Sequence, residues 1–135
     1  MEALEAVHSI GRTYNDLKLD NVIVERSGKA TLIDFGLCKK FIDSQGKHVS
    51  EDAESESFEG NVMFSSPHTL NFGVASRRDD LYQLCYMLLY LLNGHKFPGH
   101  LEQELEKVRN SMEKRMQVSY QFKKGHSLTR LANMV

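Results

Sequence analysis

Two short motifs, DLKLDN at residues 16–21 and DFG at residues 34–36, contain the residue types that phosphoryl transfer requires. That reaction needs little covalent participation from a protein, but it demands control of charge around the transferred group. Asp16 can hold an attacking hydroxyl in line with a phosphate, and Lys18 can neutralise that phosphate from the same side of a loop. The pair therefore predicts a catalytic loop.

Candidate metal ligands occur in the same two motifs. Mg²⁺, which would bridge the phosphates of a nucleotide, prefers hard oxygen ligands, and Asn21 and Asp34 supply them. These residues are thirteen positions apart, and β-prone runs at 22–24 and 31–33 lie between them. Because a hairpin returns its two ends to the same place, the spacing predicts that both ligands come together beside the metal ions of a nucleotide.

The elements that must position these residues are mainly helical, so the predicted fold class is α+β, mainly α, with one small hairpin. The helix at 79–93 is apolar nearly all round, so we expect it to be buried at the centre. The segment at 14–21 carries too many polar groups for a buried element, and we expect an exposed loop. Further helices are predicted at 2–9, at 101–117 (with Leu101, Leu105, Val108 and Met112 inward) and from Ser127 onward, and an extended loop at about 38–57.

Composition excludes several classes of protein. The 135 residues have a net charge of −1, with 41% hydrophobic and 26% charged residues, as in a soluble globular domain or part of one. We expect no nucleic-acid partner, and the longest apolar stretch, 84–92, is too short to span a membrane. Cys38 and Cys85 form no C-x-x-C motif, which favours a reducing, intracellular location in the cytoplasm or nucleus.

With these motifs identified, the whole chain resembles the C-terminal lobe of a serine/threonine protein kinase domain. A lysine two residues after the loop aspartate is typical of that class. GNVMFSSPH at 60–68 is similar to the end of the kinase activation segment, and SRRDDL at 76–81 is similar to the start of its central helix. Within kinases, DFGLCKKF at 34–41 and SRRDD at 76–80 resemble the casein kinase I group.

The resemblance implies a role for each motif residue. The catalytic residues would be Asp16, Lys18 and Asn21. The residues that bind ATP would be Asn21, Asp34, Phe35 and Gly36, of which Asn21 and Asp34 would hold Mg²⁺. In that family, an aspartate at the place of Asp80 supports the catalytic loop by accepting hydrogen bonds from its backbone. The implied reaction transfers the γ-phosphate of ATP to serine or threonine of a protein substrate.

The catalytic loop departs from the family pattern at its start. It begins Tyr14-Asn15 where kinases have His-Arg, which should loosen the packing against Phe35 unless Tyr14 fills the space. The missing arginine also removes the usual partner of an activation-loop phosphate. Basic groups that select phosphorylated substrates in casein kinase I relatives are reduced to Lys39, so we expect no preference for such substrates.

The largest departure is that no glycine-rich loop and no strand lysine precede the catalytic loop. We therefore expect residues 1–135 to form a partial kinase domain without its N-terminal lobe, inactive by itself. Two alternatives stay open: a catalytically impaired pseudokinase or scaffold module that binds protein partners, and a small-molecule kinase. Tyr14-Asn15 favours the first, whereas Ser66-Pro67 argues against the second. The sequence carries no signal for an oligomeric state.

Overall fold

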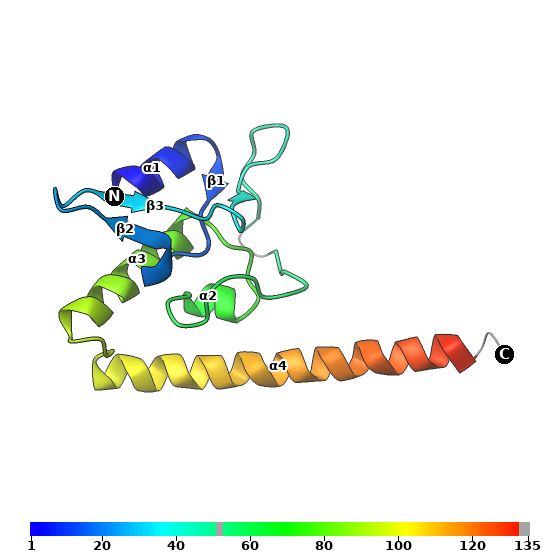
Figure 1. The fold of residues 1–135 in the computed structure, drawn as a ribbon. Helices are drawn as coiled ribbons and strands as arrows, with labels where there is room; N and C mark the ends of the chain where they lie inside the picture. The colour runs from blue at the N-terminus through cyan, green and yellow to red at the C-terminus, as the bar shows by residue number, and fades with distance from the viewer. Residues whose placement is uncertain (51–52, 133–135) are drawn as a thin grey trace.

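A helix and two short antiparallel strand pairs surround the segment at residues 14–21 in the structure, a computed structural model (Figure 1). It describes the backbone of residues 1–50 and 53–132, and the side chains of these as far as residue 118. The predicted helix at 2–9 is confirmed as α1 (Glu2–Ser9), which buries Leu4 and Val7. Gly11 follows it with a φ of 74°, a left-handed conformation that ends many helices.

The predicted hairpin is also confirmed, with its second strand one residue earlier than expected. Strands β2 (Val22–Val24) and β3 (Ala30–Leu32) pair antiparallel, with Val22 opposite Leu32. A second pair joins β1 (Arg12–Thr13) to β4 (Lys39–Lys40), which lies inside the segment predicted as a loop at 38–57. The β1–β4 pairing joins the two ends of the segment that contains both motifs, and the β2–β3 pairing lies within that segment. Residues 51–52 of the predicted loop lie outside the described residues.

The segment at 14–21 is a loop, as predicted, but the expectation that polarity keeps it out of the interior is wrong. Tyr14, Leu17 and Asn21 are buried, as is Asp16, and the loop ends in the short 3₁₀ helix η1 (Leu19–Asn21). Burial is possible because most of the loop's buried polar groups find a hydrogen-bond partner inside the protein, as described below, although the side-chain oxygen of Asn15 is buried without one.

The central helix is α3 (Arg77–Leu92), and the expectation that it is buried all round is wrong as well. Its inward face carries Asp79, Asp80 and Gln83 together with Tyr86 and Met87. Its outward face carries exposed leucines, namely Leu81, Leu88, Leu89, Leu91 and Leu92. The polar inward face exists because α3 packs on the loop at 14–21, whose backbone groups need partners.

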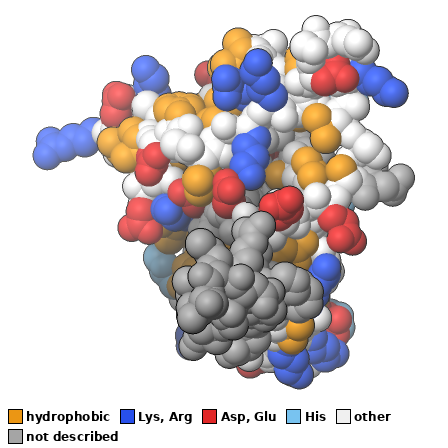
Figure 2. Space-filling view, turned by 90° about the vertical axis from the view of Figure 1, so that its right-hand side faces the viewer, with side chains coloured by type: hydrophobic (Ala, Val, Ile, Leu, Met, Phe, Trp, Pro, Cys, Tyr) orange, Lys and Arg blue, Asp and Glu red, His pale blue; other side chains and the backbone are white. Residues whose placement is uncertain are grey.

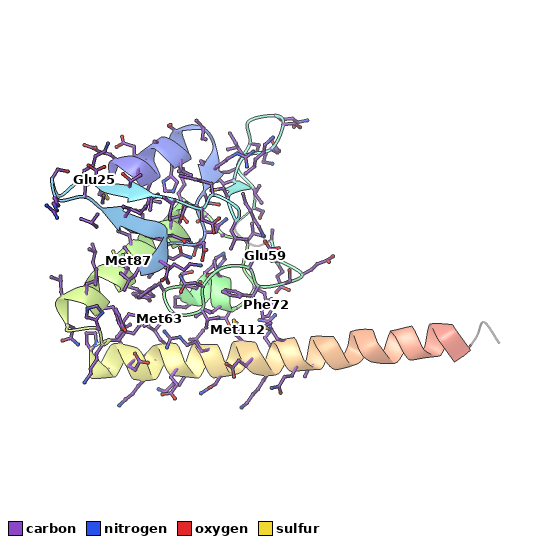
Figure 3. All side chains as sticks on the ribbon, in the orientation of Figure 1. Glu25, Glu59, Met63, Phe72, Met87 and Met112 are labelled. Atoms are coloured by element: carbon purple, nitrogen blue, oxygen red, sulfur yellow. The ribbon has the colours of Figure 1, made fainter. Side chains whose placement is uncertain are left out.

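The last helix is longer than predicted. A single helix, α4 (Gly99–Ala132), replaces the expected helices at 101–117 and from Ser127, so Ser127 does not begin a new helix. Its 34 residues extend about 50 Å. The expected inward positions are confirmed, since Leu105 and Met112 are buried, and Leu101 and Val108 pack against the two hydrophobic clusters. In Figure 3, Met112 lies beneath Phe72, which follows the short helix α2 (Pro67–Leu70).

The described surface carries charged side chains of both signs (Figure 2). Acidic and basic side chains are interspersed on the face that Figure 2 shows, rather than gathered by sign. Among the residues that the structure describes, none forms a helix with the length and apolar character needed to cross a bilayer.

Candidate catalytic site

The start of the catalytic loop is held by a buried carboxylate from α3. Asp80 has no exposed surface, and its two oxygens accept hydrogen bonds from the backbone amides of Tyr14 and Asn15, both at 2.8 Å. The ring nitrogen Nε2 of His8, from the end of α1, lies 2.8 Å from the same carboxylate. A buried charge is tolerated only when such partners replace water, so Asp80 and its three partners stabilise one loop conformation.

Asn15 turns the chain from this anchor toward Asp16. Its φ of 67° is left-handed, a conformation that asparagine adopts more readily than most residues. Its side-chain nitrogen donates to the carbonyl oxygen of Leu37 at 2.9 Å, just after the DFG motif. The residue that replaces the usual arginine therefore ties the catalytic loop to the segment that follows Asp34.

Three of the predicted site residues form one hydrogen-bonded cluster. The Asp16 carboxylate accepts from the ammonium of Lys18 at 2.8 Å and from the side-chain nitrogen of Asn21 at 2.9 Å. Asn21 also donates to the backbone oxygen of Asp16 at 2.9 Å. The hydrogen bond to Asp16 raises the pKa of Lys18, so the ammonium stays charged beside the carboxylate. A carboxylate and a cation are therefore presented together at one position of the loop.

Asp34 lies at the other end of the β2–β3 hairpin. The amide of Ile33 donates to the carbonyl oxygen of Asn21 at 3.0 Å, so the residue before Asp34 is fixed against the end of the catalytic loop. Asp34 is exposed, has a φ of 59°, and accepts a hydrogen bond from the amide of Gly36 at 3.1 Å. Its negative charge contributes to raising the pKa of Lys18, so Asp34 and the cluster share one electrostatic environment.

The residues present fit a Mg²⁺ ion bound together with a nucleotide. Asn21 uses its amide nitrogen for Asp16, which leaves the amide oxygen as a possible ligand, and Asp34 offers an exposed carboxylate. Among the described residues, no three His, Cys, Asp or Glu side chains gather to hold a metal ion by themselves. Mg²⁺ commonly takes one or two protein ligands and completes its shell with phosphates and water, which matches this donor set.

Tyr14 fills the space that the missing histidine would leave. Its ring packs edge-on against Phe35, with centroids 5.6 Å apart, and its hydroxyl donates to the carbonyl oxygen of Ile33. Burial raises the pKa of Tyr14 from 10.0 to about 12. The loop and the DFG motif are thus packed together through Tyr14, and the loosening that the sequence suggested is not seen.

We expect Tyr14→Phe to change how stability depends on pH. In the unfolded chain the phenol ionises near pH 10, whereas in the folded chain it ionises near pH 12. Because the folded state retains the proton longer, the stabilisation from Tyr14 is complete below pH 10 and is lost as pH rises toward 12. The free energy of unfolding, measured with urea, should fall between pH 8 and pH 11 in the wild type. The fall should be smaller in Tyr14→Phe. An equal loss in both proteins would contradict this prediction.

The segment at 60–68 contacts the catalytic loop directly. The side-chain nitrogen of Asn61 donates to the carbonyl oxygen of Leu17 at 2.9 Å, and its oxygen accepts from the amide of Phe64 at 3.0 Å. The hydroxyl of Ser66 donates to Asp79 of α3 at 2.5 Å. On the other side, Arg109 of α4 donates to the carbonyl oxygen of Met63 at 2.8 Å. The segment is therefore held from the loop, from α3 and from α4.

Gly60 permits the closest approach between this segment and the loop. Its φ is 128°, and a Cβ atom added there would lie 2.8 Å from the carbonyl oxygen of Asn15. We expect Gly60→Ala to lower the free energy of unfolding by about 1–3 kcal/mol, since an L-residue is strained in this conformation. Gly28→Ala is the control for backbone strain alone, because Gly28 has a φ of 84° but open space around it. Gly99→Ala is the control without either effect, because Gly99 has neither a positive φ nor a close neighbour. In urea unfolding, a loss for Gly60→Ala no larger than that for Gly28→Ala would show that the contact does not matter.

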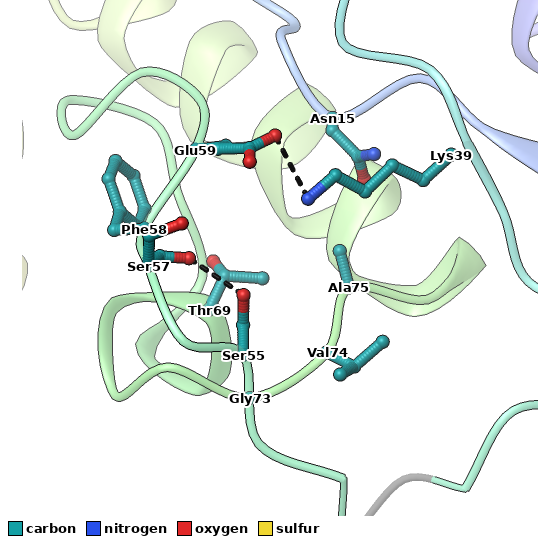
Figure 4. Close-up of a pocket in the computed structure, with 10 residues that line it drawn as sticks. All are labelled: Asn15, Lys39, Ser55, Ser57, Phe58, Glu59, Thr69, Gly73, Val74 and Ala75. Carbon is teal, nitrogen blue, oxygen red and sulfur yellow. Dashed lines mark hydrogen bonds and ion pairs between the residues drawn. The ribbon is translucent and has the colours of Figure 1, made fainter.

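A shallow pocket lies beside Asn15, between β4 and the segment before Gly60 (Figure 4). The Lys39 ammonium reaches into it and pairs with the Glu59 carboxylate at 3.0 Å. Lys39, the basic residue that the sequence analysis retained as a partner for an anion, is thus paired with a neighbouring carboxylate. The expectation that phosphorylated substrates are not preferred stays a prediction.

Sequence reasoning missed several residues that shape the site. His8, Gln83 and Asn61 all make hydrogen bonds to the catalytic loop or to Asp80, and Gly60 allows the close approach. One signal was available for Gln83, because Asp80 and Gln83 are three apart and so share one face of an otherwise apolar helix. No comparable pattern marks His8.

Comparison with known proteins agrees with this geometry. The chain is 36% identical over 97 residues to casein kinase 1-like protein HD16 of Oryza sativa, covering 67% of this chain and 14% of that protein. It is 33% identical over 91 residues to the probable casein kinase I homolog of Encephalitozoon cuniculi, covering 67% and 28%. It is 32% identical over 116 residues to casein kinase I homolog 1 of Saccharomyces cerevisiae, covering 78% and 21%.

The chain thus spans between 14% and 28% of the length of these relatives. The family model for the protein kinase domain matches residues 1–133, almost the whole chain. With casein kinase I proteins among its relatives and a catalytic-loop cluster beside a DFG motif, this chain belongs to the protein kinase family.

Proposed function

We propose that this chain is the catalytic C-terminal lobe of a casein kinase I-like serine/threonine kinase, which transfers the γ-phosphate of ATP to a protein substrate. The observation that carries the proposal is the hydrogen-bonded cluster of Asp16, Lys18 and Asn21 at the end of a hairpin that leads to Asp34. Catalysis of phosphoryl transfer depends on positioning and on charge, and these four residues supply both.

Each residue has a distinct part in this reaction. Asp16 accepts a hydrogen bond from the attacking hydroxyl of the substrate and takes its proton as the new bond forms. Lys18, whose charge is maintained by Asp16, stabilises the negative charge on the transferred phosphate. Asn21 and Asp34 would hold Mg²⁺, which neutralises the phosphates of bound ATP. Phe35 and Gly36 keep Asp34 in place, Phe35 through its contact with Tyr14 and Gly36 through its amide.

A protein is the proposed substrate because an ordered segment lies beside the cluster. Asn61 links this segment to the catalytic loop, and Ser66 anchors it to α3, which would give an extended peptide a fixed surface next to Asp16. Among the described residues that line the neighbouring pocket, the one cation, Lys39, is paired with Glu59. We therefore propose unphosphorylated serine or threonine segments as substrates.

Binding the α- and β-phosphates requires a glycine-rich loop and a strand lysine, which this sequence does not contain before Asp16. We propose that these parts come from an N-terminal lobe, and that residues 1–135 alone have negligible activity. The test joins the N-terminal lobe of casein kinase I homolog 1 of S. cerevisiae to Met1, and follows transfer of labelled γ-phosphate to dephosphorylated casein. The chimaera should transfer phosphate in the presence of Mg²⁺, and the 135-residue chain should not.

Two results would contradict the proposal in different ways. Transfer by the 135-residue chain alone would show that a second lobe is not required. A chimaera that folds and binds ATP but transfers nothing would favour the alternative of an impaired kinase fold that serves as a scaffold for protein partners.

A further inference from the structure

Gln83 lies on the inward face of α3, three residues after Asp80, and is 3% exposed. Its side-chain oxygen accepts a hydrogen bond from the backbone amide of Leu17 at 2.8 Å. Its side-chain nitrogen donates to the backbone oxygen of Asn15 at 3.0 Å. One side chain therefore holds the peptide groups on both sides of Asp16.

These two hydrogen bonds of Gln83 hold a different part of the loop from the hydrogen bonds of Asp80. Asp80 holds the amides of Tyr14 and Asn15, upstream of the catalytic residue. Gln83 holds the carbonyl that precedes Asp16 and the amide that follows it, so neither neighbouring peptide can rotate without breaking a buried hydrogen bond. The direction in which the Asp16 carboxylate leaves the backbone is set by these two peptides.

We infer that Gln83 is a positioning residue, which fixes the Asp16 carboxylate by bracing the backbone on both sides of it. The task requires a donor and an acceptor at the end of the same side chain. Glutamine provides both, glutamate provides only the acceptor when ionised, and methionine, of similar shape, provides neither. The catalytic consequence rests on the proposed function, whereas the bracing itself can be tested without it.

The first test measures amide hydrogen exchange by NMR in the 135-residue chain. In Gln83→Met, the Leu17 amide should exchange at least about tenfold faster than in the wild type, with little change at Leu105 in α4. In Gln83→Glu, the Leu17 amide should stay protected, because the carboxylate still accepts its hydrogen bond. Gln103→Met, an exposed glutamine of α4, is the matched control.

The second readout in the same samples is the side-chain amide signal of Asn21, which donates to the Asp16 carboxylate. We expect this signal to move in both Gln83 variants, since each loses the hydrogen bond to the Asn15 carbonyl, and to stay in place in Gln103→Met. The inference is overturned if the Asn21 signal stays in place, or if every amide of the chain exchanges faster by the same factor. If Gln83→Met does not fold, the inference is tested in Gln83→Glu by the Asn21 side-chain amide signal alone: a displaced signal supports it and an unchanged signal overturns it.

The third test uses the chimaera described above. A small displacement of a catalytic group lowers the rate far more than it lowers substrate binding, so kcat should fall on the order of 10- to 100-fold in Gln83→Met. KM for ATP should stay within about twofold, because the α- and β-phosphates of ATP would be bound by the N-terminal lobe of the chimaera. An unchanged kcat would overturn the catalytic part of the inference. If the wild-type chimaera is inactive, the proposed function fails, and the NMR results still decide the bracing.

Discussion

Replacing Asp16 by Asn is expected to lower kcat for phosphoryl transfer in the chimaera by about 10²- to 10⁴-fold, the usual contribution of a positioned general base. Asparagine keeps the shape of the side chain and still offers an oxygen to Lys18 and Asn21, which both donate to Asp16. It cannot take the proton of the attacking hydroxyl. The change should therefore affect the reaction and leave the fold intact.

Steady-state kinetics with separate kcat and KM, together with urea unfolding, would test this prediction. Asp20→Asn makes the same change at an exposed position of the same loop and should keep nearly full activity. If Asp16→Asn retained activity within about threefold of the wild type, Asp16 would not be the base, and the assignment of the loop would fail.

Replacing Asp80 by Asn is expected to lower the free energy of unfolding by about 3 kcal/mol, the upper end of the cost of leaving a buried hydrogen-bonding group without its partner. The carboxylate accepts from two backbone amides and lies beside Nε2 of His8. An amide has one oxygen and one NH₂ group, so one of these partners would face a donor instead of an acceptor. Two buried donors in contact, neither hydrogen-bonded, cost more than one missing bond.

Urea unfolding followed by circular dichroism would measure this loss in the 135-residue chain. Asp20→Asn is again the control, because its side chain is exposed and its replacement should change stability by less than about 0.5 kcal/mol. A loss below about 1 kcal/mol for Asp80→Asn would mean that the catalytic loop keeps its conformation without the anchor.

The parts of the site that could be predicted are those set by local residue types. Asp16, Lys18 and Asn21 lie within six consecutive residues, and the hairpin leading to Asp34 follows from β-prone runs around a turn. Such short-range patterns depend little on the rest of the chain. The structure places the first three in one cluster, although their catalytic roles stay predictions.

The environment of α3 could not be predicted, because the periodicity of apolar residues does not reveal which part of the protein the helix packs against. A helix that is apolar nearly all round is usually buried in an apolar core. Here it packs on a loop that presents unpaired amides and carbonyls, so Asp80 and Gln83 face inward and leucines face outward. The same reasoning explains why the polar loop at 14–21 is buried, since its partners on α3 lie more than 60 positions away in the sequence.

The extent of α4 was missed for a different reason. Ser127 has the character of a helix N-cap, and Gly125 lies just before it, so local preference predicts a break there. The backbone nevertheless stays helical to Ala132. Glycine within a helix costs only about 1 kcal/mol relative to alanine, which is too little to guarantee a break.

The outward leucines of α3 have a practical consequence for anyone who produces this chain. Leu81, Leu88 and Leu92 recur at helical spacing and are exposed, with Leu92 at 86%. A strip of this kind adheres to other apolar surfaces, such as chromatography resins, detergent micelles and chaperones. Purified samples would therefore benefit from low concentration or a fused solubility partner during storage.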